Sequence, residues 1–296
     1  MKSFENFAFT LCPLRYKPGC SNSYKMDKEE SYIEINKRAW NEKTAIHITS
    51  AFYANENFLK GESSLKEIEL SLLGDITGKS ILHLQCHFGQ DSISLGRLGA
   101  HVTGTDLSDE AIKKAEEFAL QTNAQAKFIC CNIYDLPEYL DAQFDIVFTT
   151  YGTISWLPDL HKWAGIISRY LKPGGRFVFV EFHPVVWMFD DDFDKPGYNY
   201  FNSGALVETE TGTYADKASP VIHDFVNWNH SISEILNSLI SRGLEINSFN
   251  EFDYLPYNCF KHTIEIEPGK YRIKHLDNKI PMLFSILATK KMVQNF

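Results

Sequence analysis

The sequence predicts an α/β protein built on a doubly wound, mostly parallel sheet of seven strands with helices on both faces. Two observations lead to this prediction. Short apolar segments alternate with amphipathic helical segments from residue 80 onward, and the alternation is broken after residue 181 by a stretch rich in aromatic residues and turn formers. Alternating strands and helices form βαβ units, which align parallel strands in one sheet between two helical layers. The interruption indicates a β-rich insertion after the fifth strand.

Helical spacing and capping residues define the expected helices. Tyr32, Ile35 and Ala39 share one face of the first helix. Gly74 ends the second helix, and Ser108 is expected to cap the N-terminus of the fourth. The expected helices cover residues 28–50, 65–73, 91–98, 109–121, 160–171 and 231–242.

Short apolar runs bounded by turn residues define the expected strands. They cover residues 80–84, 101–105, 127–131, 144–149, 176–181, 244–252 and 282–289. Two hairpins are expected in addition, one around Glu210-Thr211-Gly212 within the insertion and one at Pro268-Gly269.

The chain is expected to contain three regions. Residues 1–25 are interpreted as a disordered extension or a gene-start artefact, because Met26 followed by Asp27-Lys28-Glu29-Glu30 resembles a natural start. Residues 26–75 are expected to form an N-terminal helical cap, and residues 76–296 the main domain. Within that domain, residues 183–229 form the insertion, which we expect to cover the substrate.

Composition and charge disfavour several classes of protein. Apolar residues make up 44% and charged residues 23% of the 296 residues, which is ordinary for a chain with a buried core. The net charge of −9 argues against a nucleic-acid partner, because phosphate binding usually needs a basic face. No stretch approaches the roughly eighteen consecutive apolar residues of a membrane span. The six cysteines form no Cys-x-x-Cys pair, so we expect reduced thiols, no metal site and a cytoplasmic location.

A buried strand that runs into a tight loop and then a helix marks the expected ligand site. The strand 80–84 leads into Gln85-Cys86-His87-Phe88-Gly89. Such a loop points backbone N–H groups into the crevice at the carboxyl ends of the strands. Asp106 follows the second strand. Because a carboxylate at that place can accept both hydroxyls of a ribose, the pattern predicts a ligand that contains a nucleoside.

Taken together, these features resemble the class I S-adenosylmethionine-dependent methyltransferases. The order is strand–loop–helix, an acid after strand two, Cys131-Asn132-Ile133 after strand three, and Phe144-Asp145-Ile146-Val147 as strand four. Leu171-Lys172-Pro173-Gly174-Gly175 before strand five is a strong signature of this family, in which proline stops the helix and the glycines supply the turn. The resemblance covers about residues 75–185. It implies the class I fold, with S-adenosylmethionine as cofactor and S-adenosylhomocysteine as product.

The loop departs from the family pattern Asp/Glu-x-Gly-x-Gly-x-Gly, of which only Gly89 is kept. His83, Gln85 and His87 occupy the other places, and Asn132 replaces the acid after strand three. The string His-Leu-Gln-Cys-His-Phe-Gly-Gln-Asp resembles a bacterial subfamily of uncharacterised methyltransferases. We expect either that His87 adopts a backbone conformation normally given to glycine, or that the loop takes a different path.

The resemblance also implies a set of cofactor contacts. Backbone groups of the loop would surround the methionine portion, Asp106 the ribose, and the segments after strands two and three the adenine. The residues concerned are Cys86, His87, Phe88, Gly89, Asp106, Leu107, Asn132, Ile133 and Thr149. Thr149, with Tyr151, would lie near the sulfonium and the substrate.

A methyl acceptor that carries an acidic proton needs a base. Glu181 and His183 follow strand five and Tyr151 follows strand four, so these three are the candidate catalytic residues. His223 and His230 are weaker candidates, because a lone histidine is more often structural and His230 could cap a helix.

Structural alternatives stay open for several of these residues. Asp106 could cap a helix, Asn132 could serve only a turn, and Trp40 and Tyr53 could form a lid or simply pack. Asp190-Asp191-Asp192 could hold a divalent cation or be a solvated loop. His83 and His87 have no metal-ligand geometry, since one lies on a strand and the other in a loop.

The function favoured by the sequence is methyl transfer to a small-molecule acceptor. After strand four the chain has Thr149-Thr150-Tyr151-Gly152, where amino-methylating nucleic-acid enzymes carry Asp/Asn-Pro-Pro-Tyr/Phe. We expect no nucleic-acid or membrane partner, and a homodimer is compatible with the sequence. A non-catalytic S-adenosylmethionine-binding protein on the same fold is one alternative. An NAD(P)-dependent oxidoreductase is disfavoured because Gly-x-Gly-x-x-Gly is absent.

Overall fold

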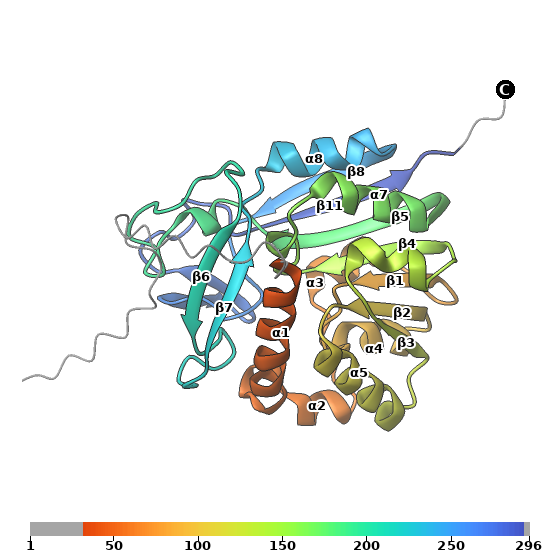
Figure 1. The fold of residues 1–296 in the computed structure, drawn as a ribbon, viewed down its shortest axis with the longest axis horizontal. Helices are drawn as coiled ribbons and strands as arrows, with labels where there is room; N and C mark the ends of the chain where they lie inside the picture. Colours follow the sequence, from red (N-terminus) through yellow and green to blue (C-terminus); the bar gives the residue numbers. More distant parts are fainter. Residues whose placement is uncertain (1–31, 293–296) are drawn as a thin grey trace, which may run out of the picture.

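A seven-stranded sheet organises the molecule, which the computed structural model describes over residues 32–292 (Figure 1). The strand order is β3-β2-β1-β4-β5-β11-β8, and β11 runs antiparallel to both of its neighbours while the other pairs are parallel. Successive strands are therefore added in one direction from β1 to β3 and in the other direction from β4 to β5. Doubly wound sheets bind ligands at this switch between β1 and β4. The strands are β1 Ser80–Leu84, β2 His101–Asp106, β3 Ala126–Cys130, β4 Phe144–Thr150, β5 Leu171–Phe182, β8 Leu244–Phe252 and β11 Leu283–Lys290.

Helices cover both faces of this sheet, as predicted. Side chains from α7 and α8 pack in one apolar cluster on one face, and α3 and α4 contribute to another cluster on the opposite face. The α-helices are α1 Tyr32–Thr49, α2 Asn55–Leu59, α3 Glu67–Leu73, α4 Gln90–Arg97, α5 Asp109–Thr122, α6 Leu136–Tyr139, α7 Leu160–Tyr170 and α8 Ile232–Ser241. Short 3₁₀ turns are η1 Ala51–Tyr53, η2 Ile133–Asp135, η3 Ile154–Trp156 and η4 Val186–Met188.

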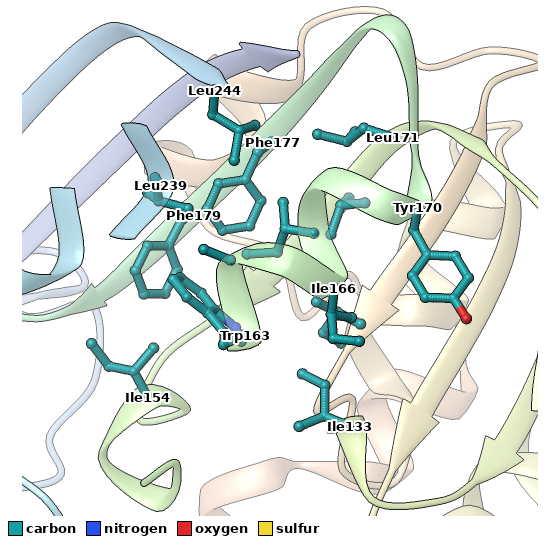
Figure 2. Packing of buried hydrophobic residues seen from close by; sticks show 14 of the residues in the cluster. Ile133, Ile154, Trp163, Ile166, Tyr170, Leu171, Phe177, Phe179, Leu239 and Leu244 are labelled. Atoms are coloured by element: carbon teal, nitrogen blue, oxygen red, sulfur yellow. The ribbon is translucent and has the colours of Figure 1, made fainter. Parts of the chain in front are cut away.

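In the core beneath α7 and α8, successive residues of β5 alternate between the two faces of the sheet. Phe177 and Phe179 of β5 point to the same side, where they meet Trp163 of α7 and Leu239 of α8 (Figure 2). Val178, between the two phenylalanines, belongs to the cluster on the opposite face. Successive strand residues alternate in this way because the backbone is pleated. Each fully buried phenylalanine contributes roughly 1.5–3 kcal/mol to the free energy of unfolding.

Two hairpins stand apart from the main sheet. In the insertion, β6 Leu206–Thr211 pairs with β7 Ile222–Asn227, and nearer the C-terminus β9 Thr263–Glu267 pairs with β10 Lys270–Ile273. The second hairpin turns at Gly269, as predicted. For the first hairpin we expected a tight turn around Gly212, and this prediction is wrong. Residues 212–221 form a longer connection between the two strands.

The helix α1 lies alongside the insertion hairpin rather than on the main sheet (Figure 1). The Asn36 side chain donates to the carbonyl oxygen of Val226 and accepts from its N–H, both at 2.8 Å. Tyr32 meets the edge of Trp228 close by. The N-terminal helix and the insertion are thus joined into one layer, although they lie far apart in the sequence.

Most of the predicted elements are present with shifts of one or two residues at their ends. Ser108 caps α5 as predicted, with its hydroxyl accepting the Ala111 N–H at 3.0 Å. Ser231, and not His230, caps α8. The prediction for residues 1–25 lies outside the described residues. Within residues 32–292, no helix is both long and apolar enough to cross a membrane.

Candidate active site

A cavity of about 760 Å³ opens at the carboxyl ends of the strands. Its floor is formed by the segments that follow β1, β2, β3 and β4, and its roof by α1 and the hairpin β6–β7. This volume lies within the range of small-molecule sites. The expected ligand site at the switch between β1 and β4 is therefore present as a cavity.

The loop after β1 keeps a glycine-like backbone without the glycines. Gln85 has φ +54° and His87 has φ +51°, and Gly89 has φ +78°. This confirms the first of the two expected outcomes for His87. Left-handed conformations of non-glycine residues cost about 1–3 kcal/mol each, so neighbouring groups must hold them. The His87 N–H donates to Asp106 Oδ2 at 2.8 Å, and the Gln85 amide donates to the Thr153 carbonyl oxygen at 2.8 Å.

Two glycines let the loop approach the second and third strands. A Cβ placed on Gly89 would lie 2.8 Å from the Phe128 ring and 2.9 Å from Ala115. A Cβ placed on Gly104 of β2 would lie 2.9 Å from Cys86 Sγ in the loop. None of these three distances is tolerated between carbon or sulfur atoms without movement of the neighbour.

Gly104→Ala is expected to lower the free energy of unfolding by about 1–3 kcal/mol, because the added methyl group overpacks the strand against Cys86. Gly96→Ala in α4 is the matched control, since its Cβ would meet nothing closer than 3.8 Å. The control is expected to stabilise the helix by up to about 1 kcal/mol. Urea unfolding of the two variants measures both effects, and equal stability of the two would contradict this account of the loop.

Asp106 ends β2 beside the loop and lines the cavity. Its Oδ2 accepts from His87 and its Oδ1 accepts from the Ser108 N–H at 2.9 Å. Burial raises the pKa of Asp106, and backbone hydrogen bonds oppose that shift. It does not cap α5, because Ser108 does. Each carboxylate oxygen can accept further hydrogen bonds, so Asp106 can hold the loop and still meet hydroxyl groups of a ligand.

The segments expected near the adenine also line the cavity. Leu107 follows Asp106, and Asn132 and Ile133 follow β3. Asn132 Oδ1 accepts the Tyr134 N–H at 3.2 Å and so caps the turn η2. The turn role left open by the sequence is therefore observed, and the adenine contact stays a prediction.

Thr149 differs from the other predicted cofactor residues because it does not line the cavity. It is fully buried, and its hydroxyl donates to the Leu84 carbonyl oxygen at 3.2 Å. Thr150 lines the cavity instead and donates to Asp91 Oδ2 at 3.2 Å. The strand extends one residue further than predicted, and neighbouring strand residues point to opposite faces.

Among the three candidate catalytic residues, only Tyr151 lines the cavity. Its φ is +45°, and its hydroxyl donates to Glu69 Oε2 at 2.8 Å. Glu69 lies fully buried on α3, where Oε1 accepts the Lys66 N–H at 2.8 Å. Burial and the neighbouring Asp91 carboxylate raise the pKa of Glu69 to about 7. Glu69 was not predicted from the sequence, because it belongs to a helix outside the motifs.

Glu181 has surroundings that do not support the predicted role as a base. The side chain is buried, and its carboxylate accepts from the N–H groups of Gly152, Thr153, Ile154 and Phe182 and from the Thr153 hydroxyl. These donors saturate the carboxylate beneath the loop that carries Tyr151. Glu181 therefore anchors this loop.

The candidate histidines are also engaged away from the cavity. His183 accepts the Val185 N–H at Nδ1, and its Nε2 lies 3.0 Å from Glu251. His230 lies between the Leu157 carbonyl oxygen and Glu234. His223 lies 3.5 Å from Glu210. None of the three lines the cavity, so these contacts favour structural roles for them.

An ion pair in the roof, between a buried lysine and a half-buried glutamate, joins α1 to the insertion hairpin. Lys43 is 4% exposed, and its Nζ lies 3.0 Å from Glu210 Oε2. The ammonium group also faces the rings of Trp40, Trp156 and Phe225 at 5.0–5.7 Å. Although burial opposes the shift, hydrogen bonds from His223 and Lys43 lower the pKa of Glu210 to about 2.

Trp40 and Tyr53 both line this cavity and both lie against the His87 ring, with centroids 5.4 Å apart in each case. They therefore close the space directly above the loop. The two side chains pack against the loop and also cover the cavity. The sequence left open whether they form a lid or simply pack, and these two roles do not exclude each other.

The acidic run of the insertion faces basic side chains. Asp192 lies 3.5 Å from Lys261 Nζ and 3.1 Å from His262 Nε2. Among residues 32–292, no three His, Cys, Asp or Glu side chains gather in a way that could hold a metal ion.

Known proteins share this domain and this fold. A family model described as a methyltransferase domain matches residues 82–179. A ubiquinone biosynthesis O-methyltransferase of Idiomarina loihiensis is 33% identical over 102 residues, which cover 34% of this chain and 42% of that protein. An uncharacterized methyltransferase of Synechocystis sp. is 32% identical over 131 residues, which cover 44% of this chain and 59% of that protein. The chain thus spans about half the length of these curated relatives.

The fold extends beyond the matched domain. The structure of a geranyl diphosphate C-methyltransferase from Streptomyces coelicolor A3(2), in complex with Mg²⁺, geranyl diphosphate and S-adenosylhomocysteine, aligns with a TM-score of 0.54. The alignment covers 88% of this chain and 99% of that chain at 15% sequence identity. The chain therefore carries a methyltransferase domain and has the class I fold of the S-adenosylmethionine-dependent methyltransferases.

Proposed function

We propose that this protein transfers a methyl group from S-adenosylmethionine to a small-molecule acceptor. The observation that carries the proposal is the backbone of the loop 85–89. Gln85 and His87 hold left-handed conformations at the two places where the family pattern has glycine. A chain that only kept the fold would not need this strained path, and the path places loop backbone against the cavity beside Asp106.

The residues around the loop fit the cofactor. Asp106 has lone pairs for the ribose hydroxyls, and Leu107 and Ile133 offer apolar surface for a planar base. Gln85 Oε1 is a buried acceptor without a hydrogen-bond partner among residues 32–292. A buried acceptor of this kind indicates a missing donor. When bound, S-adenosylmethionine supplies a methyl group on a sulfonium, which is a good electrophile.

Tyr151 and Glu69 provide a route for the proton of an acceptor hydroxyl. The Tyr151 oxygen can take this proton while its own phenol proton passes to Glu69 Oε2, 2.8 Å away. The acceptor oxygen keeps the electron pair of the broken O–H bond, and Glu69 becomes neutral. Burial raises the pKa of Tyr151 well above its ordinary value, so a relay suits this residue better than a free phenolate.

The insertion and the segment 257–261 select the acceptor. Aromatic side chains line this part of the cavity, among them Trp187 and Phe189 of the insertion and Tyr257 and Phe260 of the other segment. Such a lining suits an apolar acceptor, and it excludes water from the reacting groups. In this proposal residues 183–229 are the substrate cover, and residues 26–75 contribute the helix α1 to the same roof.

Calorimetry and a product assay test this function together. We expect binding of S-adenosylmethionine and S-adenosylhomocysteine, no binding of NAD, and a methylated product from a panel of hydroxylated aromatic compounds by mass spectrometry. Binding of NAD alone would replace the proposal with an oxidoreductase. Binding of the cofactor with no product from an extract of small metabolites would favour a non-catalytic binding protein.

Asp106→Asn is expected to weaken S-adenosylhomocysteine binding by about 10–100-fold, because hydrogen bonds to a charged acceptor are worth roughly 1.5–3 kcal/mol. Asp109→Asn is the matched control, since Asp109 is exposed on α5 and its side chain contacts Lys37 and Asn41. Calorimetry measures both affinities. Equal affinity of the two variants would remove Asp106 from the cofactor site.

A further inference from the structure

The first strand lacks the carboxylate that the family pattern places on it. His83 stands there, and its Nδ1 lies 2.8 Å from the Ser92 hydroxyl on α4. Burial lowers the pKa of His83 to about 4, so the ring is neutral at pH 7. A neutral ring that already bonds to a helix cannot supply a negative charge to the cavity.

A different carboxylate borders the cavity close to this position. Asp91, on the first turn of α4, lines the cavity two residues after the loop. Its Oδ1 accepts from the Ser64 hydroxyl at 2.6 Å, and its Oδ2 accepts from the Thr150 hydroxyl at 3.2 Å. Both donors are neutral. No Lys, Arg or His side chain forms an ion pair with Asp91 within the described part of the chain, and each oxygen keeps a lone pair for a ligand.

The surroundings of Asp91 make this end of the cavity anionic. Burial and the Asp91 carboxylate raise the pKa of Glu69, and the Glu69 side chain accepts from the Lys66 N–H and the Tyr151 hydroxyl. Two neighbouring carboxylates that form no ion pair within residues 32–292 favour the binding of a cation. The unpartnered Gln85 Oε1 adds an acceptor from the same loop.

Gln85 and Asp91 are positioned by the same segment. Gln85 donates to the carbonyl oxygen of Thr153 and Asp91 accepts from Thr150, so both are tied to the end of β4 and the segment that follows it. The fixed hydroxyl groups of Ser64 and Thr150 leave the carboxylate little freedom to turn away. This is a pre-organised acceptor set for a group with several N–H donors.

We propose that Asp91, with the Gln85 side-chain oxygen, binds the α-ammonium group of the cofactor's methionine portion in place of the missing strand carboxylate. This inference rests on the proposed function, because it requires the cofactor to bind at the loop. The negative charge has moved from the strand to the first turn of the following helix, and His83 fills the vacated position as a buried, neutral packing residue.

The test compares two probes that differ only in the ammonium group. S-Adenosylhomocysteine and its deamino analogue, in which hydrogen replaces the amino group, are titrated by calorimetry into the wild type and Asp91→Asn. In the wild type we expect the deamino analogue to bind about 10–100-fold more weakly. In Asp91→Asn we expect S-adenosylhomocysteine to weaken by the same factor while the affinity of the deamino analogue stays unchanged.

Asp106→Asn is the matched control, since it should weaken both probes equally. The asparagine at position 91 can still accept from Ser64, and urea unfolding checks that the variant is folded. Equal weakening of both probes by Asp91→Asn, or no weakening of either, would overturn the assignment. Failure of the wild type to bind S-adenosylhomocysteine would instead overturn the proposed function on which the assignment rests.

Discussion

Glu181→Ala is expected to lower the free energy of unfolding by about 3–5 kcal/mol, although Glu181 does not line the cavity. The carboxylate accepts from four backbone N–H groups and one hydroxyl in a site that is 1% exposed. Removing it leaves these donors without an acceptor, and each unsatisfied buried donor costs about 1–3 kcal/mol. Water that enters the space left by the side chain would satisfy some of these donors and so reduce the total cost. Since domains are stable by only about 5–15 kcal/mol, the loss would be severe.

Urea unfolding of purified variants measures this effect, with Glu251→Ala as the control. Glu251 lies 3.0 Å from His183 but is half exposed, so its loss is expected to cost less than about 1 kcal/mol. Glu181→Gln should fall between the two, because an amide keeps one acceptor oxygen and places N–H groups against N–H groups. A Glu181→Ala variant of normal stability that lacked activity would restore the base that the sequence suggested.

Glu181 also shows why strand-end residues are hard to assign from sequence. The prediction placed it correctly at the carboxyl end of β5, beside the cavity. The neighbouring residue Phe182 lines the cavity, and Glu181 points to the loop beneath it. The same holds at the end of β4, where Thr149 was predicted to lie at the site but Thr150 lines the cavity. A shift of one residue exchanges the two faces of a strand, and strand ends predicted from sequence are uncertain by more than that.

Local patterns were sufficient for the main sheet and for the loop. The strands β1 and β8 have the predicted bounds. Such bounds can be predicted because they depend on apolar runs and turn residues that are adjacent in the sequence. The left-handed backbone at His87 was also predictable, since it depends on its place in the motif. The helices α2 and α6 were missed because five and four residues are too few to show a helical period.

Contacts between distant segments left no trace in the sequence patterns. Tyr151 and Glu69 are 82 residues apart, and Lys43 and Glu210 are 167 apart. Nothing in the surroundings of either residue along the chain indicates its partner. The contact that ties α1 to the insertion hairpin and the contact between α3 and the candidate base therefore could not be predicted from the sequence.

The Tyr151–Glu69 pair leads to the second large effect. Tyr151→Phe is expected to lower kcat by about 10²–10⁴-fold, which is the usual contribution of a positioned acid or base. Tyr257→Phe is the matched control, because Tyr257 lines the same cavity with its ring 5.2 Å from that of Tyr151. We expect less than about tenfold from the control. The measurement is steady-state kinetics with the acceptor that the product screen identifies.

The pH dependence separates a relay from simple packing. Glu69 must be ionised to receive the proton, so kcat/KM of the wild type should rise with pH through about 7, the pKa of Glu69. Glu69→Gln should abolish this rise, and Tyr151→Phe should leave a low rate with no step near pH 7. Wild-type turnover without a step near pH 7, or a Tyr151→Phe variant with full kcat, would exclude the relay.

The same ionisation must oppose the stability of the fold. The pKa of Glu69 is raised in the folded state above its ordinary value of 4.5. The folded protein therefore holds this proton more tightly than the unfolded chain does. The stability that the neutral side chain provides is complete below pH 4.5 and is lost as the pH rises through about 7. Activity and stability should consequently change in opposite directions across this interval. Glu69→Gln, which cannot ionise, should remove both changes together, whereas a purely structural Glu69 would affect stability alone.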